Sequence, residues 1–169
     1  SLTNCVVKLL SDGRRTRAEE LLRSLSTDRR TALLTSPRFR SVLPGYPALF
    51  ARLLDECVKV WSSVRVNRLL QYAVMERNTH FTKFMLTRNV GDVNFVSGLD
   101  ELDEDDEMTF SAAGKTLLML SDSETISRLL VRYGANPNAV DFAGRTALHH
   151  ASCPQRRKQR PRKSVVKLL

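Results

Sequence analysis

The sequence predicts an all-α solenoid of helix–turn–helix repeats joined by short β-hairpin loops, preceded by an N-terminal helical capping region. Three observations predict this fold. They are a turn-rich segment opening into a short helix at residues 134–151, partial recurrences of that segment upstream, and helical patterning broken by prolines over residues 1–65. Because one such repeat cannot bury its own apolar face, repeats of this kind stack on their neighbours.

Residues 1–65 are predicted to form the N-terminal helical region. Thr16-Arg17-Ala18-Glu19 has the Thr-x-x-Glu spacing of a capping box and predicts a helix start. A longer helix is expected to start near Pro47, because proline is favoured in the first turn. Its apolar stripe consists of Phe50, Leu53, Leu54, Cys57, Trp61 and Val64. The region either covers the first repeat, as terminal repeats require, or forms an independent partner-binding module.

Residues 134–151 form the most informative segment and read Gly-Ala-Asn-Pro-Asn-Ala-Val-Asp-Phe-Ala-Gly-Arg-Thr-Ala-Leu-His-His-Ala. Gly134 and Gly144 suit the positions where a helix ends and where a hairpin reverses. Short polar side chains bond backbone N–H groups in tight turns, and those placed to do so are Asn136, Asn138 and Asp141. Thr146 can cap the following helix, because its hydroxyl can accept from a free N–H of the first turn.

The helix-opening part of this segment carries a family resemblance. Thr146-Ala147-Leu148-His149-His150-Ala151 matches the pattern Thr-Pro-Leu-His-x-Ala at five of six positions, with Ala147 in the place of proline. That pattern is the signature of the ankyrin repeat, so the chain resembles the ankyrin-repeat family. The resemblance implies stacked repeats of about 33 residues that bind other proteins and perform no catalysis. It also implies that His149 ties neighbouring turns together.

The pattern recurs upstream in degenerate form. A second copy starts at Gly114-Lys115-Thr116, and Thr116 to Gly134 is about three residues shorter than the family's spacing, so its helices must be short. A fainter copy ends on Asn89-Val90-Gly91-Asp92-Val93-Asn94, which resembles the family's closing Gly-Ala-Asp-x-Asn. These copies place repeats at about residues 66–98, 114–143 and 144–169, the last one partial, with inserts at 99–113 and 154–163.

The insert at residues 99–113 is strongly acidic. Its net charge is −7, all of it in residues 100–107. Because like charges repel one another, a solvated loop is expected. A docking strip for a basic partner, or for the chain's own basic block, is the alternative. A calcium loop is not favoured, because Met108 stands where the sharp turn of such a loop needs glycine.

The insert at residues 154–163 is strongly basic. Its cations are Arg156, Arg157, Lys158, Arg160, Arg162 and Lys163. Three interpretations stay open: a solvated insert, a nuclear import signal read by an import receptor, and a patch for a polyanion such as nucleic acid or acidic lipid. The block has no aromatic residue to stack a base, which weighs against recognition of single strands.

Composition favours a reducing compartment. The formal net charge is +9, and no apolar run approaches the roughly 20 residues that a membrane-spanning helix needs. Cys5, Cys57 and Cys153 are odd in number and widely spaced, which is typical of free thiols and not of a disulfide framework. We expect a cytosolic or nuclear protein with no membrane span.

No catalytic, cofactor or metal site is expected. Gly114-Lys115-Thr116 resembles the end of a phosphate-binding loop, but Thr109 stands where that loop needs its first glycine. Zinc needs four ligands, and beside His149, His150 and Cys153 the one further histidine is His80. The histidines are therefore expected to be structural, and the protein is not expected to be an enzyme.

Two functions remain. The first is a non-catalytic scaffold or adaptor that binds a partner protein through the hairpin tips and the groove beside them. The resemblance places partner-binding positions at Asn94, Phe95, Lys115, Val140, Asp141, Phe142, Arg145 and His150. Phe142 and Arg145 are the expected anchors, because aromatic and arginine side chains dominate interface energies, unless Phe142 folds back on the neighbouring hairpin. The second is a basic protein that associates with nucleic acid or chromatin through the basic block and the N-terminal helices.

Overall fold

The computed structural model describes residues 2–42, 45–98, 114–152 and 163–169. The chain divides into two compact units, Ser1–Tyr72 (unit 1) and Ala73–Leu169 (unit 2). The described residues are mostly helical, and the one β feature among them is an isolated antiparallel bridge between Val96 and Thr116. The predicted all-α class is therefore confirmed.

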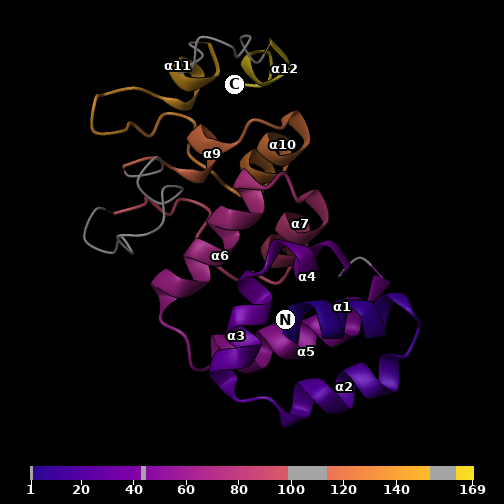
Figure 1. Cartoon of the computed structure of the whole chain (residues 1–169). Coiled ribbons are helices and arrows are strands. Elements are labelled where there is room, and N and C mark those ends of the chain that lie inside the picture. The colour runs from indigo at the N-terminus through magenta and orange to yellow at the C-terminus, as the bar shows by residue number, and fades with distance from the viewer. Residues whose placement is uncertain (1, 43–44, 99–113, 153–162) are drawn as a thin grey trace. The chain divides into compact units, whose positions relative to one another are not determined.

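Unit 1 is a cluster of helices (Figure 1). Its elements are α1 (Leu2–Ser11), α2 (Arg15–Ser24), α3 (Thr27–Thr35), α4 (Pro37–Val42), α5 (Pro47–Val58) and the larger part of α6 (Ser63–Met75). α1 packs on α2 and α4, and α3 packs on α4 and α5. Apolar residues at helical spacing give each helix one inward face, and the buried ones include Val6, Leu10, Ala18, Leu22, Phe50 and Leu54.

The capping box predicted at Thr16 is wrong. α2 begins at Arg15, so Thr16 lies inside its first turn, and no described side chain caps the helix. Glu19, the expected partner in the box, pairs instead with Arg15 at 2.7 Å. The two residues have the i, i+4 spacing of an ion pair on a helix surface, which satisfies Glu19 without a cap.

The long helix expected from Pro47 through Val64 is two helices. α5 ends at Val58, and α6 begins at Ser63. Ser62 explains the break, because its hydroxyl accepts from the Arg65 N–H at 3.4 Å and so caps a new helix. Trp61 and Ser62 therefore lie in the link between the two helices.

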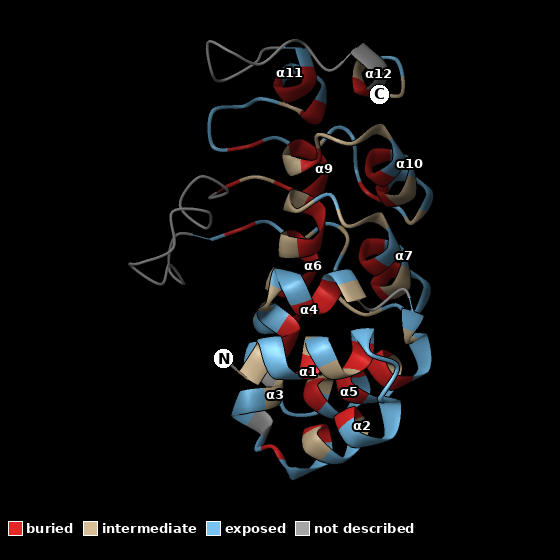
Figure 2. Cartoon of the chain, turned by 45° about the vertical axis from the view of Figure 1, so that its right-hand side comes forward, coloured by how far each residue is buried: buried red, intermediate tan, exposed pale blue. Residues whose placement is uncertain are grey.

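Unit 2 arranges its helices in two columns (Figure 2). The elements are α7 (Thr79–Thr87), α9 (Leu117–Leu120), α10 (Glu124–Arg132), α11 (Ala147–Ser152) and α12 (Lys163–Val166). Figure 2 shows α9 and α11 in one column and α7, α10 and α12 in the other. Across and along the columns, α10 packs on α7, α9 and α12, and α11 packs on α9 and α12.

Helices α7 and α10 end in the same way. Asn89 follows α7 with a φ of 55°, and Gly134 follows α10 with a φ of 91°. The next N–H bonds back to the helix in each case, from Val90 to the Met85 carbonyl at 3.0 Å and from Ala135 to the Leu130 carbonyl at 2.9 Å. A left-handed residue that closes a helix in this way satisfies its last carbonyls and sets the direction of the chain beyond it.

The turns that follow these helix ends also match. Asp92 accepts from the Asn94 N–H at 2.8 Å, and Asn136 accepts from the Asn138 N–H at 3.0 Å. Each is a side chain that bonds the backbone two residues on, as predicted for residues 134–151. The two turns align Asn94 with Asn138.

Two hairpins come next, hairpin 1 (residues 96–98 and 114–116) and hairpin 2 (residues 140–146). In hairpin 1 the Ser97 N–H donates to the Lys115 carbonyl at 3.3 Å. In hairpin 2 the Asp141 N–H donates to the Arg145 carbonyl at 2.9 Å. The backbone bonds therefore align Ser97 with Asp141 and Lys115 with Arg145.

Candidate functional site

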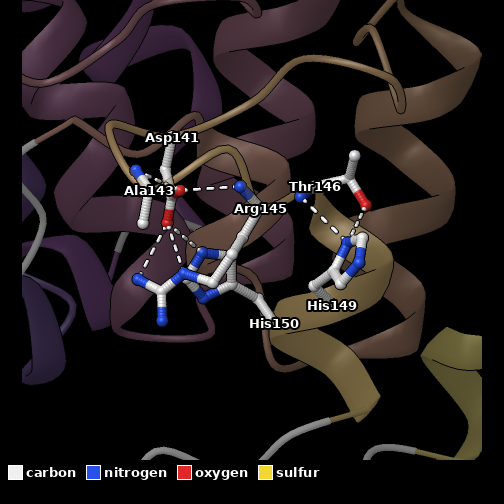
Figure 3. Close-up of polar contacts among 6 residues, drawn as sticks. All are labelled: Asp141, Ala143, Arg145, Thr146, His149 and His150. Atoms are coloured by element: carbon white, nitrogen blue, oxygen red, sulfur yellow. Dashed lines mark hydrogen bonds and ion pairs between the residues drawn. The ribbon is translucent and has the colours of Figure 1, made fainter.

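Hairpin 2 is built around one buried carboxylate, that of Asp141 (Figure 3). Its Oδ1 accepts from the N–H groups of Ala143 and Arg145, each at 2.9 Å. Its Oδ2 lies 3.0 Å from Arg145 Nε, 2.9 Å from Arg145 Nη2 and 2.8 Å from His150 Nε2. The carboxylate thus joins the tip of the hairpin to the helix that follows it.

The environment keeps Asp141 ionised and His150 neutral. Burial on its own raises the pKa of Asp141, but the bonds from Arg145, His150 and Ala143 outweigh it and hold that pKa well below its usual range. Burial lowers the pKa of His150, the bond to Asp141 raises it, nearby Arg145 and Lys115 lower it, and the net direction is down. Neutral His150 then donates its Nε2 proton to Asp141.

His149 makes different contacts from those of His150. Its Nδ1 accepts from the Thr146 N–H at 3.2 Å and lies 2.8 Å from the Thr146 hydroxyl. A side chain in the third position of a helix that accepts from the residue before the helix is half of a capping box, here with histidine in the place of Glu or Gln. Both bonds lie within the first turn of α11 and do not join neighbouring turns, which is the role that the resemblance implied for His149. The cap at Thr146 is also made by its N–H and not, as predicted, by its hydroxyl accepting from a free N–H of that turn.

Phe142 stands at the tip of hairpin 2 and is 74% exposed. Its ring also touches hairpin 1, because a Cβ built on Gly114 would lie 2.3 Å from Phe142 Cδ2. Gly114 is buried and has a φ of +72°. The ring therefore rests on the neighbouring hairpin, as one alternative expected, and still presents most of its surface to solvent.

The other predicted positions on hairpins 1 and 2 divide by exposure. Val140 is exposed, the side chain of Arg145 is 45% exposed, and Lys115 is half-buried. Asp141 and His150 are buried in their mutual bond and offer a partner little surface. Val140, Phe142 and Arg145 are thus the residues that the structure brings together on one accessible hairpin.

Asn94 and Phe95 lie in the chain just before hairpin 1. The Asn94 side chain donates to the Gly134 carbonyl at 3.1 Å and accepts from the Asn136 N–H at 2.8 Å. It therefore joins the two loops of unit 2, a contact that the sequence interpretation missed. Phe95 is half-buried and aligns with Ala139 in the bonding register. The one feature of the sequence that could have indicated the Asn94 contact is that Asn94 and Asn138 hold matching positions in the two turns.

The two charged blocks fall outside the described residues. Residues 99–113 follow Gly98 and precede Gly114 at hairpin 1, where the Gly114 N–H donates to the Ser97 carbonyl at 2.6 Å. Of the basic block, Arg156, Arg157, Lys158, Arg160 and Arg162 are outside the described residues, and Lys163 begins α12. The interpretations of both blocks stay predictions.

The described residues contain no group of three or more His, Cys, Asp or Glu placed to hold a metal ion. Cys5 is exposed and Cys57 is buried, both as free thiols, and burial raises the pKa of Cys57. In the same part of the chain, no helix is both long enough and apolar enough to cross a membrane.

Comparisons with known proteins add no relative. A scan against protein-family models, a search of curated proteins and a search of solved structures each gave no match.

Proposed function

We propose that unit 2 is a degenerate ankyrin-repeat array and that the chain is a non-catalytic scaffold that binds a partner protein through hairpin 2. The repetition within unit 2 supports the array. α7 and α10 share their end geometry, the turns after them share an Asx bond, and the hairpins share a backbone register. Stacked units that repeat in this way bury a continuous core and expose their loops along one edge.

The observation that carries the proposal is the exposed and supported ring of Phe142. Hairpin 1 lies under the ring, and the Asp141 bonds hold the hairpin that carries it. An aromatic side chain fixed before binding loses little conformational entropy when a partner covers it. Aromatic anchors of this kind dominate the energy of protein interfaces.

Exposed apolar surface in unit 2 gathers on the same edge. Among its described residues, the large apolar side chains that are exposed are Val96, Val131, Val140, Phe142 and Leu148. Three of these five belong to the hairpins, and Val96 aligns with Val140 in the register. Arg145 adds a half-exposed cation beside them. The partner expected from this chemistry offers an apolar pocket with a carboxylate at its rim.

Affinity purification with mass spectrometry tests the proposal. The full chain is compared with the double variant Phe142→Ala, Arg145→Ala, in the cell type that expresses it. The partners captured by the wild type should be reduced at least tenfold by the double variant. That factor corresponds to about 1.4 kcal/mol, a modest value for an anchor.

Val60→Ala is the matched control, because Val60 is a 69% exposed apolar residue that belongs to unit 1. It should capture the same partners as the wild type. Equal capture by all three proteins overturns the anchor assignment. Loss of binding together with a lowered melting temperature in the double variant also counts against it, because Arg145 bonds Asp141. In that case the single variant Phe142→Ala replaces the double variant in the comparison with the wild type.

We further propose a location in the cytosol or nucleus, which the cysteine pattern supports, and an import signal at 156–163, which the residue types there support. The absence of enzymatic activity is part of the proposal.

A further inference from the structure

The second column of unit 2 carries a cation two residues after a buried apolar residue on α7, on α10 and directly after α12. In α7, Lys83 follows buried Phe81 by two residues. In α10, Arg128 follows buried Ile126 by two residues. After α12, Lys167 follows buried Val165 by two residues.

This spacing directs Lys83 and Arg128 away from the core. Successive residues of a helix are rotated by about 100°, so a side chain two residues after a buried one points to the opposite face. Lys167 follows the last residue of α12, and its exposure comes from the structure and not from the helical period. Lys83, Arg128 and Lys167 are all exposed. Figure 2 shows α7, α10 and α12 in one column, and α10 packs on both of its neighbours.

The three residues therefore form a line, here named the cation row. Packed helices lie roughly 8–10 Å apart, so the row extends over about 20 Å. Arg128 pairs with Glu124 at 2.7 Å, but both side chains of this i, i+4 pair are well exposed. Exposed pairs of this type are weak, and an anion of higher charge can take the place of Glu124. Arg88 and Arg132 follow α7 and end α10, and add further cations to the same column.

We infer that the cation row is a binding surface for the phosphate backbone of a nucleic-acid duplex. Lys and Arg side chains make phosphate contacts that carry no base specificity, and a row of them can follow the regular spacing of phosphates along a duplex. An apolar anchor on this surface is small: on the described outer faces of α7 and α10 the exposed large apolar side chain is Val131, which is 37% exposed. Aromatic and arginine anchors dominate protein interfaces, so the row of charge favours a phosphate backbone over a protein partner. This surface lies on the helix column and not on hairpin 2, so it is independent of the proposed partner site.

The salt dependence of duplex binding tests the inference. The full chain and its triple variant Lys83→Gln, Arg128→Gln, Lys167→Gln are titrated against a labelled DNA duplex between about 50 and 200 mM salt. Each phosphate contact contributes about 0.9 to the slope of log affinity against log salt. The triple variant should therefore lose about 2.7 from that slope, equally for two duplexes of unrelated sequence.

Two control variants locate the effect. Lys8→Gln, Arg29→Gln, Lys59→Gln removes three exposed cations from unit 1 and should change the slope much less. Phe142→Ala removes the proposed protein anchor and should leave the slope unchanged, so the two proposals can fail separately. If the triple variant of the cation row does not fold, each of its single variants should lower the slope by about 0.9.

Three results would overturn the inference. One is an unchanged slope in the triple variant. Another is an equal loss of slope in the unit 1 control, which would show that the slope depends on the net charge of the chain and not on the cation row. The third is that a polyglutamate peptide requires the cation row for binding whereas the duplex does not. That result would assign the surface to an acidic protein.

Discussion

Hairpin 1 and hairpin 2 share a backbone register and differ in the hydrogen bonds that close their loops. Hairpin 2 places Phe142 and Ala143 between Asp141 and Gly144, and the Asp141 carboxylate closes the loop with side-chain bonds. Hairpin 1 has Ser97 in the place of Asp141, and backbone bonds of Ser97 with Lys115 and Gly114 close it. Residues 99–113 enter the chain at that point.

The difference indicates a division of tasks between the hairpins. A loop fixed by a buried carboxylate holds one conformation, which suits the presentation of an aromatic anchor. A hairpin closed through its backbone accepts a long insertion at its tip at small entropic cost, because loop closure depends weakly on length. Hairpin 1 also supports hairpin 2, since Gly114 lies under the Phe142 ring.

The largest expected effect is that of Asp141→Ala. The substitution removes the acceptor of Ala143, Arg145 and His150 and leaves the buried His150 donor unsatisfied. We expect a loss of about 3 kcal/mol in the free energy of unfolding, measured by urea denaturation. Ser97→Ala, at the aligned position of hairpin 1, should cost less than about 1 kcal/mol. Equal losses would remove the distinction between the hairpins.

Glycine substitutions separate backbone strain from the support of the ring. Gly114 and Gly144 both have a φ of +72°, so alanine at either position costs roughly 1–2 kcal/mol. Gly144 has no neighbouring atom within 4 Å of an added Cβ, whereas at Gly114 the Cβ meets the Phe142 ring. Gly114→Ala should be the more destabilising of the two in thermal unfolding. The reverse order would contradict the contact with the ring.

Asn94→Ala should destabilise unit 2 by about 1 kcal/mol. The substitution removes two bonds to the backbone of the next loop, at Gly134 and Asn136. Asn138, the aligned residue before hairpin 2, is exposed, and its backbone N–H donates to Asn136. Asn138→Ala should therefore stay within about 0.5 kcal/mol of the wild type. Urea denaturation of the two variants side by side checks the contrast.

The smallest expected effect is a dependence of hairpin 2 on pH through His150. Its pKa is lowered in the folded chain, so the unfolded chain takes up the proton first as the pH falls. The contribution is present above the usual histidine pKa of about 6.5 and is lost as the pH falls through the folded value. Hairpin 1 has Leu120 at the aligned position and lacks this group. Stability should fall more steeply below pH 7 in the wild type than in His150→Gln, and parallel curves would contradict the assignment.

The local features of unit 2 were predictable because they follow local rules. Glycine at the end of a helix and Asn in turns act within a few residues, and the structure shows them at Gly134 and Asn136. At Thr146 the start of the helix was predicted, but the bond there runs from the Thr146 N–H to His149 Nδ1 and not to the threonine hydroxyl. The same rules failed at Thr16, because a matching spacing does not decide which residue begins a helix.

The contacts that fix the candidate site were beyond such rules. Asp141 and His150 are nine residues apart, and the bonds of Asn94 span 40 and 42 residues. The contact between Phe142 and Gly114 depends on how two hairpins lie against each other. Periodicity places residues on a face, but it does not give the orientation of a side chain on a loop.

Partner capture by the two glycine variants tests the central claim most directly, namely that hairpin 1 supports the Phe142 anchor. Gly114→Ala and Gly144→Ala carry the same backbone strain, and the ring is displaced in the first alone. Affinity purification at a temperature where both variants are folded should show partner loss with Gly114→Ala and retention with Gly144→Ala. Equal capture by both variants would contradict the claim.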